Sequence, residues 1–335
     1  MFLPFTTLHE VIALVDRTID KRRTRAEMLL TEMSFRAHPA LPAHGYLDQL
    51  ERLLFYPAEL GDGLIGSTWF GIWLDTLGRW HQTLSAAQGG ASMLPPPLDL
   101  DALEDLAGRF TLREEAVPDF IRAVVPPSHS FRCPVRTGAP QRPGDRGWET
   151  ALHTAIASAD NKVPGLARVI NRCITHFLIL DDVAFRSCSA DRYLGLVLLS
   201  TSDQSLIDIE ESIIHELGHQ VLYRIESDTP LFKSKDGEET LVLPWSGSKR
   251  NYFGFLHACY IYLILMEYYE KAVQMHPFDR DFCRERLAFI KSGLAGARPI
   301  LLESADVLTR DGVALRDAMA GQMSDALVRG EVETA

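Results

Sequence analysis

The stretch SIIHELGHQ at residues 212–220 decides how the second half of the chain is interpreted, because it carries His-Glu-x-x-His inside an apolar segment. In an α-helix each residue turns by about 100°, so His215 and His219 lie about 40° apart, one turn along the axis. Two imidazoles in this position can hold one metal ion. Glu216 is turned about 100° from His215, where it can contact a water or ligand on that ion. The motif predicts a metal-binding helix.

The helix predicted around the motif spans residues 205–225, and its apolar residues would bury it on both sides. These residues are Ile213, Ile214, Leu217, Val221, Leu222 and Ile225. Glycine inside a helix is about 1 kcal/mol less favourable than alanine. We therefore expect Gly218 to let a strand or a ligand approach closely. The alternative interpretation of the motif is a helix whose two histidines face a polar cleft without a metal.

Two candidates for a third protein ligand lie on a later, very apolar segment at about 252–273. His257 and Glu267 are ten positions apart, which places them about 80° apart around a helix and about 15 Å apart along it. They cannot both bind the same ion. We favour His257, because small residues in GFLHACY (254–260) leave room for another helix to pack closely.

The pattern along the rest of the chain predicts an α+β fold that is predominantly α. Helices are expected at about 7–33, 46–57, 67–86 and 100–108, forming a helical N-terminal region over 1–147. The stretch 124–147 is rich in Pro, Gly and Arg and is the best candidate for a domain boundary, which we place near 147. Residues 148–335 are expected to form a metal domain with a small sheet. Its predicted elements are helices at 148–172, 278–293 and 304–329, strands at 175–180 and 193–200, and a loop at 226–249.

Composition excludes several classes of protein. The chain has 335 residues, of which 46% are hydrophobic and 24% charged, and no apolar run is long enough to span a membrane. A net charge of -11 argues against nucleic acid as a partner, since phosphate binding needs a basic face. The N-terminus lacks a basic region and a small-residue cleavage site, so we expect a cytoplasmic protein. Five scattered cysteines without a Cys-x-x-Cys pair argue against a disulfide framework and a thiolate zinc site.

The motifs together resemble a known family. HELGH at 215–219, PWSGSKRN at 244–251 and GFLH at 254–257 resemble the HExxH-motif peptide-modifying proteins of ribosomal natural-product pathways. That family has a His-Glu-x-x-His helix, a loop with Pro-Trp-Arg and Asp-Pro-Arg-Pro, and a Gly-x-x-His helix. The match covers roughly 190–270. Where the family has arginine after Pro-Trp, this chain has Ser246, whereas Trp245 and Arg250 carry over.

The resemblance implies a zincin-like metal domain and an Fe(II)- and 2-oxoglutarate-dependent dioxygenase that β-hydroxylates a residue of a ribosomal precursor peptide. His215, His219 and His257 would then hold Fe(II) and leave three coordination positions for the 2-oxo acid and dioxygen. Glu267 in place of His257 would give the two-histidine, one-carboxylate set that such oxygenases commonly use. The distal carboxylate of 2-oxoglutarate needs a cation, for which Arg250 is the candidate.

Two other functions stay open. In a zinc metallopeptidase the same ligands would hold Zn²⁺, Glu216 would be the general base, and Tyr223 or Tyr260 could stabilise the oxyanion. Both enzymes would act on a peptide, which the strand at 193–200 could bind by pairing at an exposed sheet edge. A non-catalytic, metal-stabilised peptide-binding module is the third possibility. Glu216 argues against it, because a purely structural site has no need of that residue.

Overall fold

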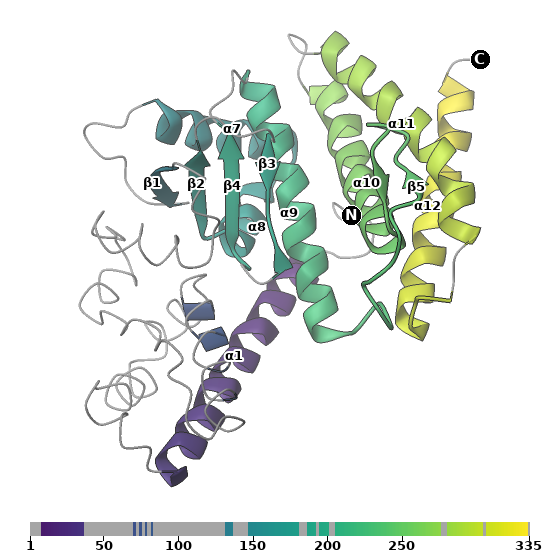
Figure 1. Ribbon diagram of the computed structural model, residues 1–335. Coiled ribbons are helices and arrows are strands. Elements are labelled where there is room, and N and C mark those ends of the chain that lie inside the picture. The colour runs from purple at the N-terminus through teal and green to yellow at the C-terminus, as the bar shows by residue number, and fades with distance from the viewer. Residues whose placement is uncertain are drawn as a thin grey trace. The chain divides into compact units, whose positions relative to one another are not determined.

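The structure is a computed structural model, and Figure 1 shows its helices and strands. It describes residues 8–36, 70–71, 74–75, 78, 82, 131–136, 147–180, 186–191, 194–200, 205–275, 280–303 and 306–333. The helices are α1 (Leu8–Arg36), α7 (Trp148–Lys162), α8 (Leu166–Cys173), α9 (Leu206–Asp228), α10 (Tyr252–Met275), α11 (Arg280–Glu303) and α12 (Arg310–Glu333). The strands are β1 (Phe131–Arg136), β2 (His176–Leu180), β3 (Ser187–Cys188), β4 (Leu196–Ser200), β5 (Leu241–Val242) and β6 (Lys249–Arg250). The predicted α+β class with a predominance of helix is confirmed.

By their internal contacts the residues divide into two compact units. One contains residues 1–14, 150–173 and 204–335, and the other contains 15–149 and 174–203. The first unit holds most of the helices and the complete His-Glu-x-x-His motif. The second unit holds the main sheet. The predicted domain boundary near residue 147 stays a prediction.

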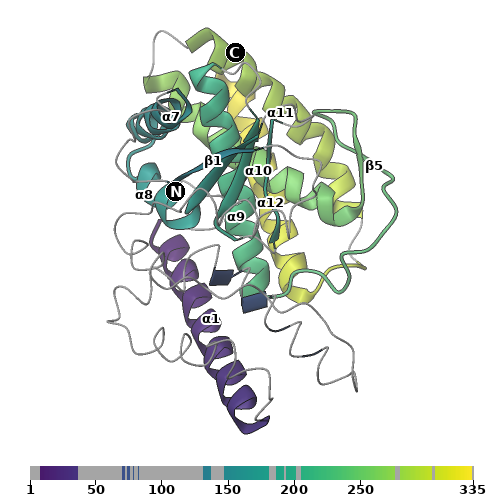
Figure 2. The same cartoon turned by 60° about the vertical axis from the view of Figure 1, so that its left-hand side comes forward.

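Helix α10 is the centre of the first unit. Helices α9, α11 and α12 pack against it, as does the short hairpin of β5 and β6. The side chains of α10 are buried around most of its circumference, which is typical of a helix that is apolar on all sides. The chain between α9 and α10, which contains β5, runs along the outside of these helices in Figure 2. This segment includes the loop predicted at 226–249, although α9 extends to Asp228.

Helix α9 begins where the sequence predicts, because Ser205 and Asp208 form a capping box. The Ser205 hydroxyl accepts the backbone N–H of Asp208 at 3.3 Å, and the Asp208 carboxylate accepts the backbone N–H of Ser205 at 3.1 Å. At the other end Thr229 has an extended backbone, and its N–H donates to the Ile225 carbonyl at 2.7 Å. These contacts fix both ends of the helix that carries the motif.

The second unit contains a four-stranded sheet in the order β1-β2-β4-β3. Strands β2 and β4 are parallel, while β1 and β3 add to them antiparallel on either side. The prediction that the strand at 193–200 offers an exposed edge to a peptide is wrong, because β3 pairs with β4 at Leu198 and Leu199. Strand β1 lies within the stretch interpreted as a boundary. Its Pro134 is compatible with an edge strand, where the missing N–H breaks no interior ladder.

The remaining predicted elements have mixed outcomes. Helix α1 confirms the prediction at 7–33, and the helix predicted at 148–172 is present as α7 and α8. The two are separated by a turn at 163–165 in which Gly165 has a positive φ of 91°. The helices predicted at 46–57 and 100–108 lie outside the described residues. None of the helices that the structure describes is long and apolar enough to cross a membrane.

Candidate metal centre

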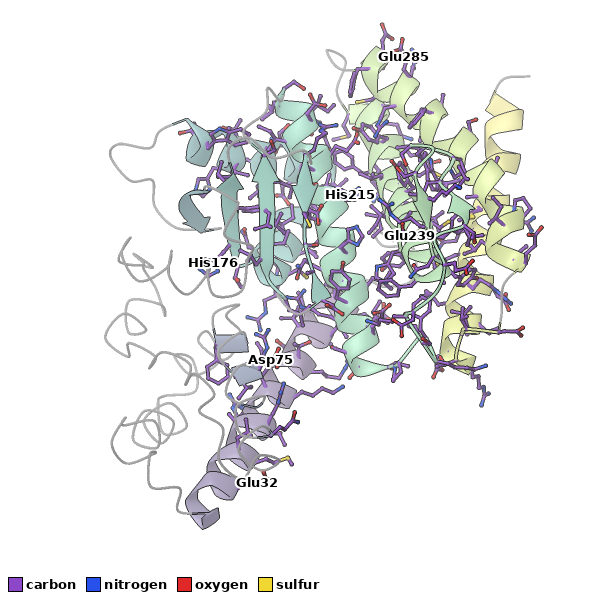
Figure 3. All side chains as sticks on the ribbon, in the orientation of Figure 1. Glu32, Asp75, His176, His215, Glu239 and Glu285 are labelled. Atoms are coloured by element: carbon purple, nitrogen blue, oxygen red, sulfur yellow. The ribbon has the colours of Figure 1, made fainter. Side chains whose placement is uncertain are left out.

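Three histidine side chains come together where α9 packs against α10. The rings of His215 and His219 have centroids 5.1 Å apart, and those of His219 and His257 are 5.8 Å apart. Figure 3 labels His215 on the side of α9 that faces α10. His215 and His219 are half-buried, whereas His257 is buried. The structure thus brings His257, from a distant part of the sequence, next to the motif histidines.

Gly218 is the reason that the two helices approach so closely. A Cβ atom at this position would lie 2.7 Å from Cδ1 of Ile261 and 3.1 Å from Cδ1 of Ile264, both on α10. A side chain at this position would force these two isoleucine side chains to move. The sequence predicted a close approach by a strand or a ligand, and that prediction is wrong, because the neighbouring element is a helix. The absence of a side chain at Gly218 places His257 opposite His219.

The surroundings of His219 disfavour the charged form of its imidazole. Desolvation lowers the pKa of His219 well below its usual value of 6.5, and the neighbouring His215 and His257 lower that pKa further. Its Nδ1 atom is buried, and among the described residues it has no hydrogen-bond partner. A neutral imidazole with a buried, unbonded ring nitrogen is a suitable ligand for a metal ion.

The ring of His257 is in contact with Glu226 at Nε2. The sequence analysis missed Glu226. The distance from Nε2 of His257 to Oε1 of Glu226 is 2.8 Å, and Nζ of Lys235 lies 2.7 Å from Oε2 of the same carboxylate. Glu226 follows His215 by eleven residues, close to three full turns, so both lie on the same face of α9. This spacing was the available signal for Glu226.

Aromatic rings flank the histidines. Phe253 lies 4.2 Å from the His257 ring, and Tyr223 lies 5.7 Å from His219 and 5.4 Å from His257, all measured between ring centroids. On the other side Tyr262 meets His215 edge-on at 6.5 Å. The Tyr262 ring in turn stacks on Trp245 at 3.9 Å. The imidazoles are therefore part of a continuous layer of rings between α9, α10 and the loop that joins them.

The motif pair has the spacing that a shared ion requires, whereas the third ligand is not in place. Two imidazoles that bind one ion at about 2.1 Å per nitrogen have ring centres roughly 5 Å apart, as His215 and His219 do. Nε2 of His257 is directed at Glu226 instead. Within the described part of the chain, no three or more His, Cys, Asp or Glu side chains form a group arranged to hold a metal. The pair fits an ion, and a third ligand would have to be completed by His257 through Nδ1 or after a rotation of its ring.

The structure places the other predicted site residues on α9, α10 and β6, and among the contacts of the described residues it does not bring Arg250 to the three histidines. Glu216 is buried, with 1% of its surface exposed, on the turn of α9 between the two motif histidines. Glu267 lies on α10, ten residues beyond His257. Arg250 is an exposed residue of β6, where one of its Nη atoms donates to the Lys249 carbonyl at 2.7 Å and its chain packs against Gly254. The roles predicted for Glu216 and Arg250, and the choice of His257 over Glu267, stay predictions.

A buried polar network, one helical turn before His215, fixes α9 to its neighbours. Glu210 forms an ion pair with Lys162 of α7 and accepts a hydrogen bond from the hydroxyl of Tyr268, and the side chains of this ion pair are 1% exposed. The next residue, Glu211, accepts a hydrogen bond from the Tyr269 hydroxyl at 2.6 Å and one from Nε of Arg286 at 2.8 Å. These pairings set the register of α9 against α10.

The comparisons with known proteins add no family. No protein-family model matches the chain, and no curated protein matches it either. The resemblance to the peptide-modifying HExxH family, which depends on the three short motifs, stays a prediction.

Proposed function

We propose that this protein is a metal-dependent peptide-modifying enzyme, and specifically an Fe(II)- and 2-oxoglutarate-dependent hydroxylase that acts on a residue of a ribosomal precursor peptide. The observation that supports a metal centre most directly is the meeting of His215, His219 and His257, with the neutral His219 imidazole at its middle. The choice of iron, cosubstrate and peptide rests on the resemblance of the motifs.

In this proposal His215 and His219 hold the ion as an i, i+4 pair and His257 completes the set. Iron held by these residues, together with a 2-oxo acid and dioxygen, would supply the oxidising chemistry for hydroxylation. The burial of Glu216 next to both motif histidines suits a group that holds a proton or orients a ligand at the ion. The rings of Tyr223 and Phe253 cover the buried His257 imidazole.

Arg250 is the proposed partner of the cosubstrate carboxylate. Its guanidinium carries five N–H donors in a planar fork, which matches a carboxylate in two-point contact. One of its Nη atoms already donates to the Lys249 carbonyl, and the rest of this exposed side chain is at the surface of β6. Gly254, in the first turn of α10, allows the side chain of Arg250 to lie against that turn. His257 is on the same helix. This contact joins the proposed carboxylate site to the helix of the third ligand.

Anaerobic reconstitution tests the proposal. The protein is mixed with Fe(II) and then with 2-oxoglutarate, and the metal-to-ligand charge-transfer absorption is recorded. We expect the band to form only when both are present, and Arg250→Ala to raise the concentration of 2-oxoglutarate needed to reach half of it. Arg310→Ala, at the first residue of α12, is the matched control and should leave that concentration unchanged.

Two other outcomes identify the alternative functions. Cleavage of peptides in the presence of Zn²⁺, without the absorption band, would favour the metallopeptidase with Glu216 as general base. In that case Tyr223, whose ring lies beside His219 and His257, is the better candidate for the oxyanion than the fully buried Tyr260. Bound metal without either activity would favour the peptide-binding module.

A further inference from the structure

We propose that Glu226 is a positioning residue of the metal centre, which holds the Nε2–H of His257 and leaves Nδ1 of that ring as the nitrogen that binds the ion. The inference rests on the proposed metal centre and assigns a residue that neither the motif nor the resemblance includes.

The contact between the two side chains determines where the His257 proton lies. Nε2 and Oε1 are 2.8 Å apart, and the two side chains are only 3% and 5% exposed. An ionised carboxylate can only accept hydrogen bonds, so the imidazole must donate from Nε2. In a neutral imidazole the other nitrogen then carries the lone pair. Nδ1 is therefore the atom of His257 that a cation can use.

Lys235 holds the carboxylate from its other end. Its ammonium lies 2.7 Å from Oε2 of Glu226 and 4.9 Å from the centre of the Phe253 ring. The loop that carries Lys235 is tied to α10, because the side-chain amide of Asn251 donates to the Lys235 carbonyl at 3.0 Å. The Asn251 side-chain oxygen also accepts the Gly254 N–H at 2.9 Å, within the first turn of the same helix. Glu226 thus contacts His257 through Oε1 and lies in an ion pair with Lys235 through Oε2.

The faces of the His257 ring are fixed as well. Phe253 contacts it at 4.2 Å and Tyr223 at 5.4 Å between centroids, with tilts of 40° and 39°. Rings on its faces and a carboxylate at one edge leave His257 little freedom to rotate. A ligand whose orientation and tautomer are set in advance binds a metal more tightly, and loss of such a partner typically lowers metal affinity about 10- to 100-fold.

A different assignment would make Glu226 itself a ligand. Two donor atoms that share an ion also lie about 3 Å apart, so the 2.8 Å distance would also suit a metal-bound protein in which Nε2 of His257 and Oε1 of Glu226 are both ligands. The two assignments predict different metal stoichiometries. A positioning residue leaves the number of bound ions unchanged, whereas removal of a ligand from a small set abolishes binding.

The experiment compares Glu226→Leu with Glu270→Leu in the full chain. Glu270, near the C-terminal end of α10, is the matched control. Its carboxylate also pairs with a lysine, since Nζ of Lys291 lies 2.9 Å from its Oε1 atom. The first readout is the ¹⁵N NMR spectrum of the metal-free protein at pH 8, which shows which nitrogen of the His257 ring carries the proton. We expect the proton of His257 on Nε2 in the wild type and in Glu270→Leu, and a mixture of tautomers in Glu226→Leu.

The second readout is the affinity for Zn²⁺, measured by competition with a chromophoric chelator. We expect Glu226→Leu to bind Zn²⁺ about 10- to 100-fold more weakly with unchanged stoichiometry, and Glu270→Leu to bind as the wild type does. Glu226→Gln keeps the shape of the side chain and an acceptor oxygen, so it should lose less affinity for Zn²⁺ than Glu226→Leu does. If Glu226→Leu does not fold, Glu226→Gln replaces it in the experiment.

Three results would overturn the inference. They are a His257 tautomer that Glu226→Leu does not change, an unchanged affinity for Zn²⁺, and complete loss of the ion from Glu226→Leu. A wild-type protein that binds no Zn²⁺ and no Fe(II) would instead refute the proposed metal centre. The NMR result would still show whether Glu226 orients His257, so the two failures can be told apart.

Discussion

Replacement of Gly218 by alanine tests whether α10 packs against the motif helix as closely as the structure shows. The added Cβ would lie 2.7 Å from Cδ1 of Ile261 and 3.1 Å from Cδ1 of Ile264, closer than ordinary van der Waals contact. Both contacts are with side-chain ends on a helix with almost no free space, since Ile261 and Ile264 are 0% exposed. The substitution must therefore displace α10 or force these isoleucines out of their rotamers.

The size of the effect follows from two opposing contributions. Alanine in a helix is about 1 kcal/mol more favourable than glycine. An extra methyl group in a packed interior typically lowers the free energy of unfolding by about 1–3 kcal/mol. Gly218→Ala should therefore be between neutral and about 2 kcal/mol less stable than the wild type. Gly321→Ala is the control, because a Cβ on this exposed residue of α12 meets nothing within 4 Å. It should gain about 1 kcal/mol from helix propensity alone.

Urea unfolding followed by circular dichroism measures both variants, and a double-mutant cycle with Ile261→Val identifies the contact. Ile261→Val removes the Cδ1 atom that the new methyl group meets, and on its own should cost about 0.5–1.5 kcal/mol. In the Gly218→Ala background the same change should cost less or even stabilise the protein, which gives a coupling of about 0.5 kcal/mol or more. The reasoning is refuted if Gly218→Ala stabilises as much as Gly321→Ala and shows no coupling to Ile261.

Two further predictions concern buried charge and pH. Lys162→Met should lower the free energy of unfolding by about 3–5 kcal/mol, because it leaves the Glu210 carboxylate buried without its cation; Lys291→Met, which breaks the more exposed pair with Glu270, should change it by about 1 kcal/mol or less. Both values come from urea unfolding, and equal effects would contradict the account of the buried network. The pKa of His219 is lower in the folded protein than in the unfolded chain. Below pH 6.5 the unfolded chain therefore binds a proton at His219 that the folded protein does not bind. The stability that comes from this residue is full above pH 6.5 and declines as the pH falls. The free energy of unfolding should decline by up to about 1.4 kcal/mol per pH unit because of this residue. Between pH 7.5 and 5.5, His219→Gln, which does not titrate, should lose less free energy of unfolding than the wild type does. Parallel losses would show that His219 is not the group responsible.

Local patterns in the sequence predicted α9 and α10 well, whereas the helix predicted at 278–293 ends ten residues before α11 does. The apolar residues and the Ser205 cap define α9, and the uninterrupted apolar character of 252–273 defines α10. The i, i+4 spacing of His215 and His219 gives their shared face directly. His257 could be chosen because small residues flank it, and the structure places its ring beside that of His219.

Features that depend on residues far apart in the chain could not be predicted from the sequence. The order of strands is set by long-range pairing, so nothing local showed that β3 would cover one side of β4. The residues of β1 include Pro134 and lie in a Pro-, Gly- and Arg-rich stretch, which hides a strand whose pairing comes from β2. Gly218 predicted the close approach of another segment. The segment could not be identified, because the contacting residue on α10, Ile261, follows 43 positions later in the sequence. Glu226 was on the correct face of α9 and was missed because its partner His257 lies 31 residues further along the chain.

The most direct test of the central claim is the metal content of three proteins after equilibrium dialysis against Fe(II) without oxygen. If the histidines of α9 hold the ion, the wild type and Glu216→Gln should each retain one ion per chain, because Glu216 is not a ligand, and His219→Ala should retain none. A His219→Ala protein that keeps its metal at the wild-type stoichiometry would contradict the account.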